Sequence, residues 1–576
     1  MKYTELKQIL PLIAIAVVSF LFFQFVYPYH LFFKEQIQLF LFTPTYIFSY
    51  LAKPAALSSL AGDFFTQFLY LQGGGPLVLA VLFSAEWWLT KKALQTIGNM
   101  KNASQWALLP VASDFTAHLA LLYSPRNTMG LILVLAVFLA FSRINNKALA
   151  TTLFIISVAV GHWLFGNAII VLPFLLLFST NIYRPKIIAK LSLLLVVIFV
   201  YIGRPFYLLP VKEAFLYPAF SVKDLLPLVV FVATIFISEL TLFTKKYNRF
   251  SIWIVSVLFP VILISGFKLN ANFGLEKILA LDSETYFGNT NKVIKLAEKY
   301  KLKNRVGTYY TNMALAKKGE LPDRLLEFYQ PFTQGLILPV SQNENWQTIL
   351  FSNELFYLIG DMNLAQHSSM LGNTFSPYNR SSRMIKRLAE INMINGDYKG
   401  AEKFLRMLEK TLFHSKWAAK QIKEINSGTT PDWLVSKRTQ IAQTDTIRNS
   451  SDYLHAIEFL VRQNPRNKIA LDYLLCFHLL NKDLISFKNT YDRYAKPLNF
   501  PPQKVYAEAL LISLFKEKVS EETFQKYKIN PAVLTEFINY TGRFEETKGD
   551  LNQLKEKYGT SYWFYYHFAT MKEAGE

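Results

Sequence analysis

Long apolar runs with few charges dominate the first 268 residues, and they constrain the fold more than any other feature. Of the 61 Lys and Arg residues, 20 lie in residues 1–268, together with only 8 of the 41 Asp and Glu residues. Residues 269–576 hold the other 41 basic and 33 acidic residues, a composition that is ordinary for a water-soluble domain. The contrast excludes a single soluble domain and a disordered chain, and the lone Cys476 excludes a disulfide scaffold. We therefore predict a polytopic membrane domain over 1–268 and a second domain over 269–576.

Nine apolar stretches in the first domain are candidate membrane spans. They cover roughly residues 9–27, 76–90, 105–123, 128–142, 148–165, 167–180, 190–203, 225–243 and 251–267. A spanning helix needs about 20 apolar residues. Several stretches are shorter, so their boundaries are approximate. The two that flank Gly166 and Asn167 can also be interpreted as one continuous segment. The sequence predicts an all-α helix bundle of about nine spans.

The basic residues predict an orientation. With the N-terminus in the cytoplasm, thirteen Lys and Arg residues lie on the cytoplasmic side and seven on the other, as the positive-inside rule favours. The thirteen are Lys2, Lys7, Lys91, Lys92, Lys101, Arg143, Lys147, Arg184, Lys186, Lys190, Lys245, Lys246 and Arg249. An odd number of spans then places residues 269–576 outside the cytoplasm. The net charge of +20 is therefore partly a topology signal, and no nucleic-acid partner is predicted.

The loop over residues 28–75, between the first two predicted spans, holds two aromatic-rich amphipathic stretches, Leu31–Tyr50 and Leu57–Leu71. Such stretches are too polar to span a membrane, and they favour the interface with membrane lipid. Packing against neighbouring helices is an equally good interpretation.

Polar residues in the membrane domain are candidate functional residues, because ionisable groups are costly there. Those predicted on the outer side are Glu35, Gln38, Asp63, Asp114, His118, Arg126, His162 and Arg204. Asp114 and His118 are four residues apart and share a helix face, so they either line a pocket or pair inside the bundle. Arg126 and Arg204 either bind a lipid phosphate or anchor helix ends at the interface. No metal-binding spacing is present, and no cofactor is assigned.

The second domain follows helical periodicity and repeats one turn. Gly319–Glu320–Leu321, Gly360–Asp361–Met362 and Gly396–Asp397–Tyr398 are spaced 41 and 36 residues apart, each between two predicted helices. Ala365 and Ala401 follow the Gly of their turns by five residues, Pro377 follows Ala365 by twelve, and Ala389 precedes Ala401 by twelve. These offsets resemble the tetratricopeptide repeat and predict a TPR-like α-solenoid. Stacked helical repeats bind peptides or proteins or serve as architecture. The basic cluster Arg380–Arg387 is interpreted as a solvated helix face, with an acidic partner as the alternative, and residues 421–450 as an irregular joint.

Three strings resemble an uncharacterised family of Bacteroidota inner-membrane proteins with a repeat tail: RLAEINMINGDYKGAEKFLRMLEKTLF from Arg387, KEQIQLFLF from Lys34 and NMALAKKGELPDRLLEFYQ from Asn312. The resemblance implies a bacterial inner-membrane protein whose second domain is periplasmic. It implies no activity.

The architecture also resembles the polytopic glycosyltransferases of the GT-C type. Those enzymes carry a catalytic carboxylate in the first outer loop and take sugar from a polyprenyl phosphate, and some end in tetratricopeptide repeats. Glu35 stands at the comparable place, with Asp63 as the other carboxylate of the loop. The Asp-Asp or Asp-Glu pair of those enzymes is absent, and nine spans is few.

Two functional hypotheses follow. In the first, the chain is a transferase in which Glu35 is the general base and Asp63 is secondary. Arg126 and Arg204 stabilise the lipid phosphate, His118 and His162 line the pocket, and the repeats present the acceptor. In the second, the chain is a non-enzymatic scaffold whose repeats recruit envelope proteins or peptides. A transporter is least favoured, because the spans show no internal symmetry.

Overall fold

The computed structural model describes residues 3–98, 100, 102–179, 186–242, 247–340, 344–442, 444 and 452–570. Five residues of the orientation argument lie outside them, namely Lys2, Lys101, Arg184, Lys245 and Lys246. The described residues are all-α, as predicted, and contain no strand. They form two compact units, Met1–Glu276 with Met407–Trp417, and Lys277–Arg406 with Ala418–Glu576.

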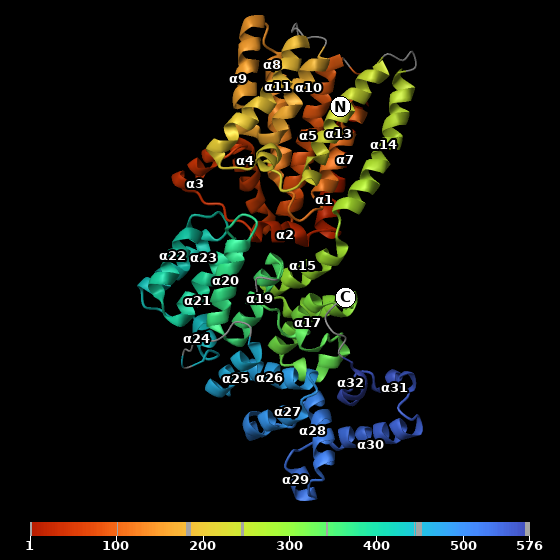
Figure 1. The fold of residues 1–576 in the computed structure, drawn as a ribbon, viewed down its shortest axis with the longest axis vertical. Coiled ribbons are helices and arrows are strands. Elements are labelled where there is room, and N and C mark those ends of the chain that lie inside the picture. The colour runs from red at the N-terminus through yellow and green to blue at the C-terminus, as the bar shows by residue number, and fades with distance from the viewer. Residues whose placement is uncertain are drawn as a thin grey trace. The chain divides into compact units, whose positions relative to one another are not determined.

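The first unit is a bundle of helices (Figure 1). Its helices are α1 (Tyr3–Phe25), α2 (Tyr29–Gln36), α3 (Pro44–Ser49), α4 (Ala56–Thr66), α5 (Gly74–Gly98), α6 (Ala103–Trp106), α7 (Leu108–Ala117), α8 (Pro125–Ser142), α9 (Lys147–Phe165), α10 (Val171–Phe178), α11 (Lys186–Gly203), α12 (Val211–Leu216), α13 (Leu226–Leu242) and α14 (Tyr247–Asn270).

The prediction of about nine spans is wrong for the described residues. Four segments are long and apolar enough to cross a membrane: Pro125–Ser142, Ala148–Phe178, Ala189–Tyr207 and Phe250–Asn270. A fifth arises only if Ile9–Phe25 and Tyr29–Gln36, which are bent by 80° at their junction, count as one span.

The predicted spans fail for different reasons. The stretches around Gly166 are one segment, as the alternative interpretation allowed. The stretch 105–123 breaks into α6 and the ten-residue α7, which at about 1.5 Å per residue is too short. The helix α5 is long enough but not apolar enough. Because the orientation argument needs an odd number of spans, the periplasmic placement stays a prediction.

The predicted interfacial loop folds into α2, α3 and α4. In α2 the side chains from His30 to Gln36 are buried, and α4 packs on α8. Only α3 keeps every residue accessible, with Phe48 among its exposed apolar side chains.

The second unit consists of short helices joined by tight turns. They are α15 (Phe273–Tyr286, which begins in the first unit), α16 (Thr290–Tyr300), α17 (Arg305–Lys318), α18 (Leu321–Arg324), α19 (Trp346–Ile359), α20 (Met362–Phe375), α21 (Ser382–Asn395), α22 (Tyr398–Glu409), α23 (Ser415–Asn426), α24 (Asp432–Arg438), α25 (Tyr453–Gln463), α26 (Lys468–Leu480), α27 (Leu484–Thr490), α28 (Lys504–Glu517), α29 (Glu521–Gln525), α30 (Pro531–Glu546), α31 (Leu551–Tyr558) and α32 (Tyr562–Phe568).

The repeated Gly-acid turns lie between helices, as predicted. Gly319, Gly360 and Gly396 end α17, α19 and α21 with positive φ angles of 74°, 90° and 79°, which glycine adopts without steric cost. In the second and third turns the acid caps the following helix. Asp361 Oδ1 accepts from Leu364 N at 3.1 Å, and Asp397 Oδ1 accepts from Gly400 N at 2.9 Å. The turns define helical hairpins, and the solenoid order predicted from them stays a prediction.

A buried ion network joins α15, α19 and α21. Arg383, whose side chain is 1% exposed, donates to both carboxylate oxygens of Asp282 at 2.8 and 2.7 Å and to Glu354 at 2.9 Å. Arg387 donates to both oxygens of Glu354, at 3.0 and 2.8 Å, and to Glu390. The interpretation of this cluster as a solvated helix face is therefore wrong for Arg383 and Arg387. Their side chains face carboxylates that lie 29 to 101 residues away in the chain, which periodicity cannot detect.

Two arginines on one carboxylate make the network acid-sensitive. Burial alone would raise the pKa of Glu354, but the charges of Arg387 and Arg383 outweigh it and lower the pKa to about 2. The stabilisation is complete above the ordinary glutamate pKa and is lost as the pH falls from about 5 towards 2.

We expect Glu354→Gln to lower the opening free energy of α15, α19 and α21 by about 3–5 kcal/mol, because it leaves two buried guanidinium groups without their shared carboxylate. Hydrogen–deuterium exchange of the full chain near neutral pH measures this locally. Glu402→Gln is the control, since Glu402 forms an exposed pair with Arg406 and should change exchange by less than about 1 kcal/mol. Equal effects of the two variants would contradict the prediction.

Candidate functional site

Asp63 and Arg126, predicted separately as catalytic and phosphate-binding residues, form a closed ion pair. Arg126 Nε and one terminal nitrogen each lie 2.6 Å from a different oxygen of Asp63, and the Tyr50 hydroxyl donates to the same carboxylate at 2.5 Å. The side chain of Asp63 is 4% exposed and that of Arg126 is 12% exposed. The helices α4 and α8, which carry these residues, approach so closely that a Cβ at Gly62 would lie 2.4 Å from the backbone nitrogen of Arg126. The guanidinium fork is thus occupied by a protein carboxylate.

Asp114 and His118 pair inside the first unit, as the alternative interpretation had it. Asp114 accepts hydrogen bonds from the Tyr123 hydroxyl at 2.5 Å and from the Thr128 hydroxyl at 2.7 Å. His118 Nε2 lies 2.9 Å from Thr128 Oγ1 and 3.7 Å from Asp114. All four side chains are buried. Lys34 completes this cluster, because its ammonium donates to the carbonyl oxygens of His118 and Tyr123 at 2.9 Å.

The remaining predicted residues have other neighbours. Glu35 is buried, and its Oε1 lies 3.6 Å from Nε2 of His414, in the Met407–Trp417 segment of the same unit. His162 Nε2 lies 2.9 Å from the carbonyl oxygen of Ala214. Arg204 lies over the ring of Tyr201 at 4.8 Å. Gln38 reaches another predicted residue, since its Nε2 lies 3.5 Å from the backbone oxygen of Asp63.

The structure therefore brings Asp63, Arg126 and Gln38 together, and Asp114 with His118, in closed contacts. Among the described residues, no group of three or more His, Cys, Asp or Glu side chains is placed to hold a metal ion.

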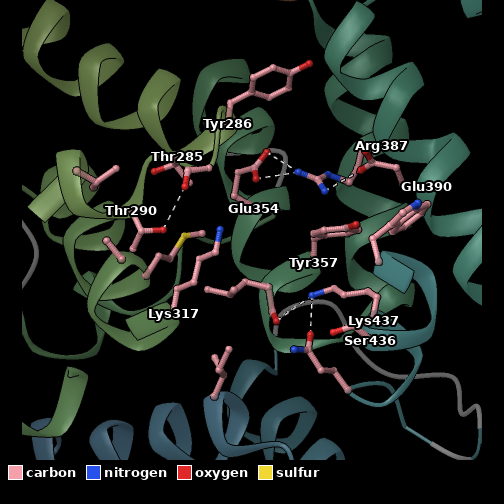
Figure 2. A pocket seen from close by; sticks show the side chains of 18 of the residues that line it. Thr285, Tyr286, Thr290, Lys317, Glu354, Tyr357, Arg387, Glu390, Ser436 and Lys437 are labelled. Carbon is pink, nitrogen blue, oxygen red and sulfur yellow. Dashed lines mark hydrogen bonds and ion pairs between the residues drawn. The ribbon is translucent and has the colours of Figure 1, made fainter. Parts of the chain in front are cut away.

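The second unit contains an open cavity of about 520 Å³ that sequence reasoning missed (Figure 2). It is lined by side chains from α15, α16, α17, α19, α21, α24 and α26. Five cations border it, namely Lys317, Arg383, Lys386, Arg387 and Lys437, against two carboxylates, Glu354 and Glu390. Glu354 and Arg387 lie on one side of the cavity as a bonded pair, and Lys437 lies beside Tyr357.

The cations of the cavity differ in their partners. The two arginines are neutralised by the ion network, and Lys386 lies 3.9 Å from Glu390. Lys437 instead donates to two neutral acceptors, the Leu358 carbonyl at 3.2 Å and Gln440 Oε1 at 2.8 Å, and its ammonium lies 4.6 Å from the centre of the Tyr357 ring. Burial and the charges of Arg387 and Lys317, opposed by Glu390 and Glu354, lower the pKa of Lys437 to about 7.

Two segments that line this cavity have sequence interpretations that the structure corrects. Arg383 and Arg387 belong to the basic cluster that was interpreted as solvated, and Lys437 lies in the 421–450 stretch that was interpreted as an irregular joint. That second interpretation is wrong for residues 421–426, which belong to α23, and for residues 432–438, which form α24. Residues 443 and 445–450 of the stretch lie outside the described part of the chain.

Comparison with known proteins yields one match. Residues 2–569 match a family described as a family of unknown function (DUF6057). No curated protein and no solved structure matches the chain.

We expect Asp63→Asn to destabilise the first unit by about 3–5 kcal/mol, because Arg126, which is largely buried, then loses the carboxylate charge 2.6 Å away. Adding Arg126→Gln should recover part of the loss, since the uncompensated charge is removed. Thermal unfolding of the detergent-solubilised full chain measures both. The exposed Glu213→Gln serves as the control and should stay within about 0.5 kcal/mol. Strictly additive effects of the two changes would show that the ion pair does not act as a unit.

Proposed function

The chain belongs to this family of unknown function, and we propose that it acts as a membrane-anchored binding protein. In this proposal the first unit is the anchor, and the second unit holds a protein or peptide partner of the cell envelope. The observation that carries the proposal is a contrast. The predicted catalytic residues of the first unit are engaged in separate buried contacts, whereas the second unit offers an open, charged cavity of about 520 Å³.

The apolar surface of the first unit supports the anchor. In the candidate spans Ala189–Tyr207 and Phe250–Asn270 only 22% and 17% of the residues are buried. Their exposed side chains include Leu194, Ile202 and Trp253, each more than half exposed. Helices this apolar on their outer side are stable in lipid and prone to aggregation in water. In this proposal the protein lies in a bacterial inner membrane, with the second unit in the periplasm.

The transferase hypothesis predicts a different molecule. It needs Glu35 as a free general base near a lipid-linked sugar, Asp63 beside it, and Arg126 and Arg204 on the departing phosphate. The closed Asp63–Arg126 pair and the contact of Glu35 with His414 argue for structural roles. The architecture that resembles the GT-C enzymes keeps the hypothesis as the alternative to be tested.

One substitution separates the two functions. We expect Glu35→Gln to restore a strain that lacks the chromosomal copy as fully as the wild-type chain does, because the amide keeps the shape of the side chain and removes only its basicity. The measurement is complementation of the deletion phenotype, with immunoblots to equalise protein abundance.

Glu354→Gln is the companion control, since it disrupts the second unit and should fail to complement. Loss of complementation by Glu35→Gln at normal abundance would reject the binding-protein proposal and favour the transferase.

A further inference from the structure

Two lysines of the cavity carry charge that the protein does not neutralise. Among the described residues, neither Lys317 nor Lys437 has a carboxylate within ion-pair distance, whereas the neighbouring arginines are fully paired. In Figure 2 the Lys317 side chain extends among the lining residues, and Lys437 lies below the Tyr357 ring. The protein therefore leaves two ammonium groups available to a bound anion.

The geometry around Lys437 holds its ammonium in place for a ligand. Gln440 and the Leu358 carbonyl accept two of its three hydrogens, at 2.8 and 3.2 Å. The Tyr357 ring beside it is covered by the Arg387 guanidinium, 3.7 Å from its centre. A lysine fixed in this way retains one hydrogen for a further acceptor.

The shape and lining of the cavity favour a segment of a longer molecule. Lys317 and Ser436 are exposed, so the cavity opens to solvent and a bound chain can continue beyond it. Val293, Met313 and Ile469 add apolar wall between the charged residues. A wall that contains both cationic and apolar side chains suits a peptide that carries both acidic and apolar side chains.

We propose that this cavity binds an acidic peptide segment of a protein partner, whose carboxylates are held by the ammonium groups of Lys317 and Lys437. The inference rests on the proposed binding function and names the chemistry of its partner. The paired arginines shape the site, and the two lysines provide the attraction.

The test uses the full chain in detergent and a fluorescein-labelled peptide of alternating Glu and Leu. Fluorescence anisotropy should show saturable binding of this peptide and none of the matched peptide with Gln in place of Glu. Lys437→Gln and Lys317→Gln should each weaken binding about tenfold or more, since each removes a charge-assisted hydrogen bond. Lys420→Gln is the matched control, because Lys420 is 73% exposed on α23 and does not line the cavity.

The pH dependence isolates Lys437. It is faced by Arg387 and Glu390 from α21, Glu354 and Tyr357 from α19, and Lys317 from α17. Only its protonated form attracts a carboxylate, so the affinity should fall as the pH rises from about 6 to about 8.5. Lys437→Arg keeps the charge over this range and should bind with a flat profile, which a purely structural role of Lys437 would not produce.

Three results would overturn the assignment: equal binding of the two peptides, unchanged affinity in both lysine variants, or displacement of the peptide by inorganic phosphate that binds alone with the same lysine dependence. The last would make the cavity a site for free anions. Peptide binding does not depend on Glu35, so the two proposals can fail separately. If the full chain does not bind the peptide but Glu35→Gln still complements, only the ligand assignment is wrong. Failed complementation by Glu35→Gln with intact peptide binding removes the proposed function alone.

Discussion

The buried charge of Arg383 is the constraint on which the second unit depends. A guanidinium that is 1% exposed costs several kcal/mol unless carboxylates surround it, and Asp282 and Glu354 do so from α15 and α19. Glu354 also binds Arg387, so α19 and α21 are joined at one carboxylate, and α15 is joined to them through Arg383. Because these helices form part of the cavity wall, the network that pairs the arginines also determines which cations stay unpaired at its edge.

The cost of burying charge also governs the first unit, where it leaves the predicted site residues in closed contacts. There each buried ionisable group that the sequence singled out meets a partner in the protein, as Asp63 meets Arg126 and Asp114 meets Thr128 and Tyr123. The helices α4 and α8 approach closely at Gly62, and the Asp63 carboxylate lies in direct contact with the Arg126 guanidinium at 2.6 Å. Polar groups that are costly to bury are therefore used to hold helices together, and the proposed anchor role follows from that closure.

Local signals in the sequence predicted local structure well. The Gly-acid turns are helix ends because glycine adopts the left-handed conformation and, in two of the three, the next acid caps a helix; both effects act within a few residues. The number of spans was overestimated because apolar composition does not reveal breaks such as the one between α6 and α7. The cavity of the second unit was not predicted from the sequence, because Lys437 and Lys317 are 120 residues apart in numbering and share no motif.

By itself the sequence determined that the chain is helical, that its two halves differ in polarity, and where several of its turns lie, because these depend on composition and on neighbours along the chain. The tertiary structure decided which charges are neutralised. A lysine and an arginine look alike in a sequence, but Arg383 meets Asp282 across 101 residues whereas Lys437 donates to two neutral acceptors. The energy of a charge depends on the distance to its counter-charge and on its burial, and both exist only once the chain has folded.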